Sequence, residues 1–212
     1  QMCIRDRRMK KEIDIYDFDK TIVPFDSGSL FTAYCFLHYP WCFITLPIIA
    51  VAALLMVLHI INFTSFKKTC FLFLPLIPKE KAVKKFWDRH INEVHPWFKE
   101  RTRYSVVISA SPDFLLNDIA KRLDFDKLIC TRHNPKNGII IGENCRDGEK
   151  VRRLYEEFCR DCVEVKDVYS DSLRHDKPIF SLANGKCYHI VKGEKIPFDF
   201  NEVYGENTKV KN

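Results

Sequence analysis

Three short hydrophobic segments of this 212-residue chain each end in a cluster of small polar and acidic side chains. The segments are 12–17 (EIDIYD), 105–109 (SVVIS) and 165–170 (VKDVYS), and the clusters read DFD, SAS and SDS. Strands that alternate with helices favour a mostly parallel sheet. In such sheets ligands bind at the carboxyl ends of the strands. We therefore predict an α/β, Rossmann-like fold with helices on both faces and a polar site at that edge.

Shorter patterns indicate the other elements of the core. Three further runs are predicted as strands, the third being the last in the chain: KLICT (127–131), GIIIG (138–142) and CYHIV (187–191). Ser111 or Asp113 is expected to cap the helix after the second main strand, with Pro112 near its first turn. The run EKVRRLYEEFCRDC (149–162) is expected to form another helix.

The segment 26–104 separates the first strand from the second and differs from both in composition. Forty consecutive residues, 27–66, contain no Asp, Glu, Lys or Arg. The following 67–103 contain ten basic and four acidic side chains, an excess equal to the net charge of +6 of the whole chain. This local basic segment argues against a general nucleic-acid binder. We predict an inserted helical cap with a strongly apolar helix, and a catalytic core formed by 9–25 and 105–200.

Within the insertion, 41–63 is a run of 23 uncharged residues, long enough to cross a bilayer. A buried cap helix is the alternative, but a cap of this size should expose a polar face to water. Strands before and after this tract in the sequence belong to one sheet, which lies on one side of the membrane. The number of membrane crossings between them must therefore be even or zero. The run 70–78 is too short and proline-broken for a second span. A hairpin inserted part-way, or an in-plane amphipathic helix, is preferred to two spans at 29–46 and 48–66, and the basic segment suits anionic headgroups.

The spacing D-x-D-x-T at 17–21, at the end of a strand, resembles the first motif of the haloacid dehalogenase superfamily. The other three motifs follow in order: Ser109 at the end of SVVIS, Lys150 at a helix start, and Asp171 in YSDSLRHD. One DxD pair alone also occurs in solvated loops. Four motifs in order at strand ends are a specific signal, and they cover the core on both sides of the insertion.

This resemblance implies a phosphatase that works through an aspartyl-phosphate intermediate. Asp17 would be the nucleophile. Asp19 would be the general acid/base, which protonates the leaving alkoxide and then activates the water that releases phosphate. Ser109 and Lys150 would bind the phosphate oxygens, and Lys150 would also compensate negative charge.

The resemblance also implies a Mg²⁺ ion. The carboxylates of Asp17 and Asp171 and the backbone carbonyl of Asp19 would bind it. Asp176, five residues after Asp171, would orient these groups without binding the metal itself.

A second interpretation of the first motif makes Asp19 the nucleophile. The letters DKT at 19–21 also open the phosphorylation motif of P-type ATPases. That family continues DKTGT where this chain has DKTIV, and it needs a nucleotide domain and many membrane spans. The hydrophobic strand also ends on Asp17, so Asp17 is preferred.

Further features are similar to the phosphatidylglycerophosphatase C group, relatives of phosphoserine phosphatase: DFDKT followed by DS, the helical cap, the LPIIAVAALL tract and YSDSLRHDKPIF. Lys20 departs from this pattern, since many members have Gly there. The similarity implies hydrolysis of phosphatidylglycerophosphate to phosphatidylglycerol, with the core at the cytoplasmic face of a bacterial membrane. One alternative is a cytoplasmic phosphoserine-type phosphatase of a soluble monoester. Another is a membrane-attached scaffold with a dead site, which is disfavoured because every motif residue is present.

The two ends of the chain are expected to lie outside the fold. Residues 1–8 (QMCIRDRR) lead into no predicted element and resemble a translated sequencing adapter, so Met9 is expected to be the start. Residues 201–212 are expected to form a flexible tail.

A few reactive side chains remain outside the four motifs. Cys159 and Cys162 form a CxxC without a second ligand pair, so neither a metal site nor a redox site is expected there. His90 and His95 are open between a headgroup contact and ordinary packing of the cap. The sequence indicates no oligomeric state.

Overall fold

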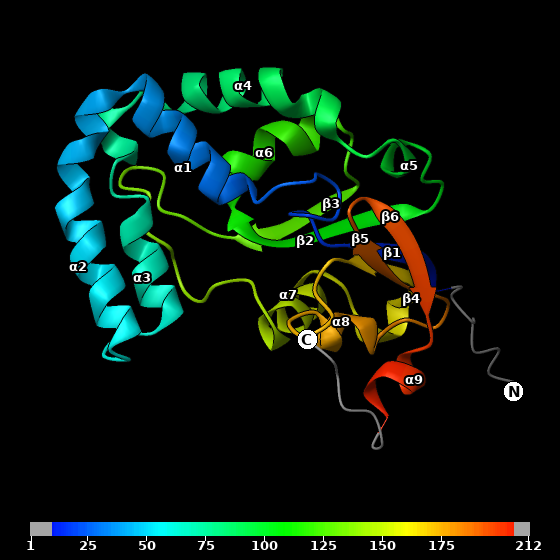
Figure 1. Ribbon diagram of the computed structural model, residues 1–212. Coiled ribbons are helices and arrows are strands. Elements are labelled where there is room, and N and C mark those ends of the chain that lie inside the picture. The colour runs from blue at the N-terminus through cyan, green and yellow to red at the C-terminus, as the bar shows by residue number, and fades with distance from the viewer. Residues whose placement is uncertain (1–9, 206–212) are drawn as a thin grey trace, which may run out of the picture.

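A computed structural model describes residues 10–205, which fold around one six-stranded sheet (Figure 1). The strands are β1 (Lys11–Tyr16), β2 (Tyr104–Pro112), β3 (Lys127–Thr131), β4 (Val163–Ser170), β5 (Cys187–Val191) and β6 (Glu194–Phe198). They lie in the order β3-β2-β1-β4-β5-β6, and only β6 runs antiparallel to its neighbour. The predicted mostly parallel α/β sheet is confirmed. The predicted adapter sequence 1–8 lies outside the described residues.

Helices cover both faces of this sheet, as predicted (Figure 1). They are α1 (Ser27–His38), α2 (Leu46–Val57), α3 (Phe63–Cys70), α4 (Lys79–His90), α5 (Pro96–Lys99), α6 (Asp113–Arg122), α7 (Gly148–Glu157), α8 (Lys177–Phe180) and α9 (Phe200–Tyr204). The alternation of β1 supplies both faces, because successive side chains of a strand point to opposite sides. Ile13 and Ile15 pack in the cluster that includes α7 and α8, whereas Tyr16 packs in the cluster with α1, α4 and α6.

Two predictions about strands need correction. The run 138–142, expected as a strand at an edge or in a hairpin, is not a strand of the sheet. It forms a short antiparallel hairpin with 132–134, in which Ile140 bridges His133 and the N–H groups of Asn134 and Ile141 donate to the carbonyls of Ile139 and Arg132. Gly138 and Gly142 both have positive φ, 70° and 72°, which turns the backbone away from an extended path. The strand β5 is also not the last. A tight turn at 192–193 leads into β6, whose exposed, charged edge and proline gave no strand signal.

The predicted helix ends also need correction. Pro112 is the N-cap residue of α6, and neither Ser111 nor Asp113 caps that helix with its side chain. The helix predicted over 149–162 stops at Glu157, and an exposed 3₁₀ turn contains Cys162. The tail predicted at 201–212 begins in α9, where the Tyr204 hydroxyl donates to the Leu173 carbonyl, and its residues 206–212 lie outside the described part of the chain.

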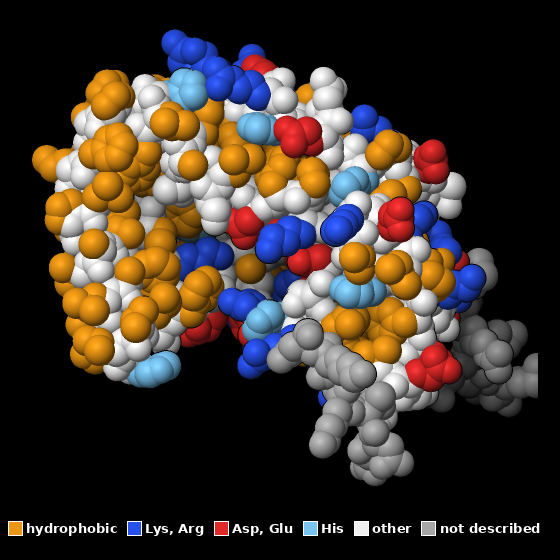
Figure 2. Space-filling model, viewed as in Figure 1, with side chains coloured by type: hydrophobic (Ala, Val, Ile, Leu, Met, Phe, Trp, Pro, Cys, Tyr) orange, Lys and Arg blue, Asp and Glu red, His pale blue; other side chains and the backbone are white. Residues whose placement is uncertain are grey.

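The uncharged tract folds as a helical hairpin. A 3₁₀ helix, Pro40–Thr45, leads into α2, and α3 returns beside α2 after a turn at 58–62. The segment Pro40–Val57 is long and apolar enough to cross a membrane by length and composition, and only 17% of it is buried, unlike a core helix. Because α2 is apolar on every side, it is not the amphipathic helix considered above. Figure 2 shows hydrophobic side chains over this side of the molecule.

Several side chains of the basic segment hold the insertion to the core. Arg101 donates to the carbonyls of Leu123 and Asp124. Arg103 forms ion pairs with Asp14 at 2.8 Å and Asp167 at 3.0 Å. Part of the positive charge of the basic segment therefore forms ion pairs and hydrogen bonds within the protein.

Candidate active site

The carboxylates of the first motif leave the sheet at the end of β1. The backbone N–H of Asp17 donates to the carbonyl of Tyr169 in β4 at 2.9 Å, which continues the β1–β4 pairing by one residue. Lys20 then adopts a positive φ of 55° as the chain turns toward α1. Asp17 and Asp19 therefore lie at the carboxyl edge of the sheet, where the topology predicts a ligand site.

Lys150 lies between two carboxylates at the start of α7. Its Nζ is 2.6 Å from Asp17 Oδ1 and 2.7 Å from Asp176 Oδ1, and the residue is only 3% exposed. Burial acts to lower the pKa of Lys150, but the two carboxylates outweigh it and raise that pKa. Lys150 is thus a fixed cation in the site, and Asp176 holds it in place.

Burial raises the pKa of the Asp17 carboxyl. Lys150 opposes this rise, while the neighbouring carboxylates Asp176 and Asp171 add to it. Burial, followed by Asp176, likewise raises the pKa of Asp171, against the effect of Lys20 and Lys150. Burial is the larger cause of both rises, and the clustered carboxylates add to it.

Asp19 is held by groups from two other elements. Its Oδ1 accepts the backbone N–H of Ser27, at the start of α1, at 2.7 Å, and its Oδ2 accepts the hydroxyl of Ser111 from β2. The Ser27 hydroxyl in turn donates to Ser111 Oγ at 3.1 Å. Burial raises the pKa of Asp19, as does Asp26, whereas the Ser111 and Ser27 hydrogen bonds lower it. Ser111 was expected only as a helix cap, so its role at Asp19 was missed.

Asp171 follows β4 and is anchored through its backbone. Its N–H donates to Thr21 Oγ1 at 2.9 Å, which explains the threonine of the first motif. Asp171 lines the same cavity as Asp17, Asp19, Lys150 and Asp176. The structure therefore brings together five of the six residues predicted for the site.

Ser109 is the exception. It is 1% exposed, its Oγ accepts the N–H of Ser111 at 3.0 Å, and it does not line the cavity. The neighbouring Ala110 and Ser111 line the cavity instead. The phosphate contact of Ser109 stays a prediction.

The cavity measures about 850 Å³ and extends from the carboxylates to the helical hairpin. Apolar side chains of the insertion form its far wall: Phe36, Phe43, Leu46, Ile49, Phe63 and Phe66. Several polar residues that line the cavity were missed in the sequence, among them Lys67, Asn144 and Arg146. Figure 2 shows charged side chains gathered in the hollow between the hairpin and the core.

The two histidines of the cap lie outside this cavity. His90 contacts Glu93 at 2.6 Å and packs against the rings of Phe25 and Phe86. His95 stacks on Trp97, with ring centroids 6.1 Å apart. Of the two roles left open for them, the structure shows packing of the cap.

The donor groups at the edge of the sheet are compatible with Mg²⁺. In the part of the chain that the structure describes, no three His, Cys, Asp or Glu side chains are arranged around a metal position. The predicted set requires only the carboxylates of Asp17 and Asp171 and one backbone carbonyl. Mg²⁺ prefers oxygen ligands and usually keeps several waters. Because burial, and after it the neighbouring carboxylates, raises both of these pKa values, a divalent cation would favour the charged form of both carboxyl groups.

Comparisons with known proteins agree with this geometry. Residues 15–181 match the family model described as haloacid dehalogenase-like hydrolase. The chain is similar to the protein CicA of Caulobacter vibrioides, with 36% identity over 94 residues, and the match spans 42% of this chain but only 41% of that relative.

Two solved structures share the fold. One is a protein of unknown function from Bordetella pertussis Tohama I, with a TM-score of 0.66, 16% identity, and coverage of 82% of this chain and 87% of that one. The other is a phosphoserine phosphohydrolase-like protein from Francisella tularensis, with a TM-score of 0.51, 16% identity, and coverage of 85% and 87%. At these identities the likeness concerns the fold alone.

Proposed function

The chain belongs to the haloacid dehalogenase-like hydrolase family and has a phosphatase-like fold, and on this premise we propose that it hydrolyses the terminal phosphate monoester of a phospholipid headgroup. Phosphatidylglycerophosphate is the substrate that the sequence resemblance implies. The observation that supports a lipid is the cavity, which joins the carboxylate cluster to the apolar wall of the hairpin.

In the proposed mechanism, a carboxylate oxygen of Asp17 attacks phosphorus and the bond to the leaving alkoxide breaks, which gives an aspartyl-phosphate. Asp19 protonates the alkoxide, then accepts a proton from the water that hydrolyses the acyl-phosphate. The hydrogen bonds from Ser27 and Ser111 hold Asp19 in one orientation for both steps. The hydrogen bonds therefore contribute to the proposed reaction by positioning Asp19.

Lys150 is placed to compensate charge on the phosphoryl oxygens, since it already contacts Asp17 at 2.6 Å. Asp176 fixes Lys150 from the other side. Asp17, Asp171 and the carbonyl of Asp19 would hold Mg²⁺, which would neutralise charge on the transferred phosphoryl group.

Replacement of Ser111 by Ala is expected to lower kcat/KM about 10-fold, because Asp19 loses one of its two positioning hydrogen bonds. The measurement is steady-state hydrolysis of p-nitrophenyl phosphate with Mg²⁺. Ser181→Ala is the matched control, because Ser181 is exposed and its hydroxyl donates to the nearby carbonyl of Pro178. Unchanged kinetics in Ser111→Ala would show that Asp19 does not need this bond.

We further propose that the hairpin enters one leaflet of a membrane with the core on the cytoplasmic side. The second helix, α3, has eight residues and is roughly 12 Å long, too short to cross a bilayer. Two full crossings would need a second span, and the hairpin does not contain one. The exposed apolar residues of α2 support insertion, because their contact with water is unfavourable.

The test of the proposed function is phosphate release, with Mg²⁺, from phosphatidylglycerophosphate in mixed micelles and from free phosphoserine. We expect turnover of the lipid and at least about 100-fold lower kcat/KM on phosphoserine, since phosphoserine has no apolar part to fill the hairpin side of the cavity. The opposite preference would identify a soluble-monoester phosphatase whose hairpin has another role. Absence of turnover on every monoester would favour a scaffold.

A further inference from the structure

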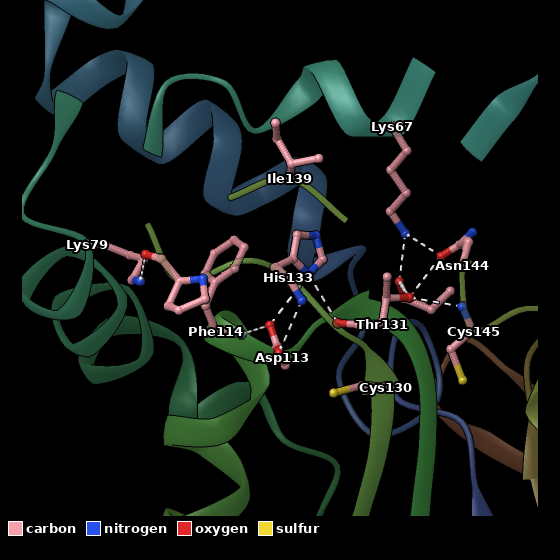
Figure 3. Close-up of polar contacts among 12 residues, drawn as sticks. Lys67, Lys79, Asp113, Phe114, Cys130, Thr131, His133, Ile139, Asn144 and Cys145 are labelled. Atoms are coloured by element: carbon pink, nitrogen blue, oxygen red, sulfur yellow. Dashed lines mark hydrogen bonds and ion pairs between the residues drawn. The ribbon is translucent and has the colours of Figure 1, made fainter. Parts of the chain in front are cut away.

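Lys67 points from the hairpin into the cavity rather than toward solvent or a membrane. It lies on α3, and its Nζ donates to the carbonyl of Ala110 at 2.6 Å and to Asn144 Oδ1 at 3.2 Å (Figure 3). Thr131 Oγ1 donates to the same Asn144 oxygen at 2.9 Å, so the acceptor is fixed by the core. The ammonium group is therefore held at a defined position beside the end of β2.

Both of these partners of Lys67 are neutral. Among residues 10–205, no carboxylate lies within ion-pair distance of its Nζ. Burial lowers the pKa of Lys67, while the more distant carboxylates of Asp19 and Asp26 act to raise it. Lys67 is half-buried, and even partial removal of a cation from water is costly unless an anion accompanies it. No carboxylate of the described residues contacts this cation directly, which leaves a place beside it for an anionic ligand.

Arg146 adds a second positive charge to the same part of the cavity. It belongs to the segment that also supplies Asn144, and its guanidinium lies 5.2 Å from the ring centroid of Phe63 in the hairpin. Its ion pair with Asp147 spans 3.9 Å, the limit of such a contact. Lys67 and Arg146 therefore lie between the carboxylate cluster and the apolar wall.

We propose that Lys67 and Arg146 form a second anion subsite, which binds a phosphodiester in the substrate while the monoester lies at Asp17. This inference rests on the proposed function, because a phospholipid with a terminal phosphate has both groups. The diester lies between the terminal phosphate and the acyl chains, as the cations lie between the carboxylates and the apolar wall. Since Lys67 comes from α3, the hairpin supplies specificity as well as attachment.

The experiment compares Lys67→Met with Lys68→Met on three substrates. Lys68 is the next residue of the same helix and does not line the cavity. Its replacement by Met removes the same charge as the replacement of Lys67. The substrates are phosphatidylglycerophosphate in mixed micelles, its deacylated water-soluble form, and p-nitrophenyl phosphate, which has no second anion. The two diester-containing substrates separate a lipid source of the anion from a free one.

We expect Lys67→Met to raise KM about 10–100-fold for both diester-containing substrates, because one charge-assisted hydrogen bond is lost. We expect kcat/KM on p-nitrophenyl phosphate to stay unchanged, and Lys68→Met to resemble the unmodified chain on all three substrates. Arg146→Met should repeat the pattern of Lys67→Met with a smaller effect, since Arg146 already has a carboxylate partner in Asp147 at 3.9 Å.

An equal loss on all three substrates would overturn the subsite, since Lys67 would then act on the cleaved phosphate. Unchanged KM for the diester-containing substrates would overturn it as well. A chain that hydrolyses p-nitrophenyl phosphate but neither diester-containing substrate, before any substitution, would instead refute the proposed function and leave the subsite without an occupant.

Discussion

Asp17→Asn is expected to lower phosphatase turnover by at least about 10³-fold, because an amide oxygen is a poor nucleophile and no aspartyl-phosphate can form. The substitution preserves shape and can keep an oxygen facing Lys150, so the fold should survive. The measurement combines steady-state phosphate release with mass spectrometry of acid-quenched peptides. The phosphorylated peptide should be present before the substitution and absent after it.

Asp26→Asn is the matched control for this loss. Asp26 lies in the same loop, and its Oδ1 accepts the N–H of Ser29 as the N-cap of α1 at 2.8 Å, a bond that an Asn oxygen can also make. Its activity should fall by no more than about 10-fold, because the cap bond is kept and only the charge that raises the pKa of Asp19 is lost. A phosphorylated peptide that persists in Asp17→Asn would move the nucleophile to Asp19, as in the P-type interpretation.

The double substitution Ile48→Glu and Val51→Glu is expected to weaken binding to anionic phospholipid vesicles about 100-fold. These side chains are 55% and 58% exposed on α2, and a bilayer would bury them. Withdrawing two such side chains costs about 3 kcal/mol in total, which corresponds to that factor. Co-sedimentation with vesicles measures the binding, and hydrolysis of p-nitrophenyl phosphate, which needs no membrane, should be retained.

Val191→Glu and Ile196→Glu together form the control for this pair. They lie 37% and 45% exposed on β5 and β6, away from the hairpin (Figure 1). Binding that resists the charges on α2 would show that the hairpin does not hold the membrane. A change in oligomeric state on adding those charges, without vesicles, would assign the apolar face to a second copy of the chain.

The positions of most candidate site residues could be predicted because they depend on local pattern and sheet topology alone. Asp17 and Asp171 each follow a hydrophobic strand, and parallel strands end at one edge. Lys150 begins a helix whose N-terminal turn faces that edge. These placements need no knowledge of distant packing.

The two serines of the SAS cluster show where local pattern fails. Ser109 and Ser111 are two positions apart and would share a face in a regular strand. The register of β2 against β3 shifts between Ser109 and Pro112, so the two hydroxyls have different partners. The Ser111 hydroxyl donates to Asp19, whereas the Ser109 hydroxyl accepts the backbone N–H of Ser111. A bulge of this kind leaves no mark in the hydrophobic pattern.

Lys67 could not have been found from sequence for a different reason. It is the first charged residue after forty uncharged ones, which placed it with the presumed headgroup contacts. Its partners Ala110 and Asn144 are 43 and 77 positions away. Only the return of α3 beside α2 turns this side chain toward the core.

The position of the insertion also affects how the chain reaches this fold. The strand β1 is synthesised before its partners β2 and β4, and Ile13 pairs with Tyr104, which is roughly 90 residues away in the sequence. Closing a loop of about 90 residues costs about 1.3 kcal/mol more than closing one of about 20. The strand β1 therefore has no partner strand until the whole insertion has been synthesised. If the hairpin inserted into a membrane early, both of its ends would be held near one surface. This would lower the entropic cost of pairing β1 with β2.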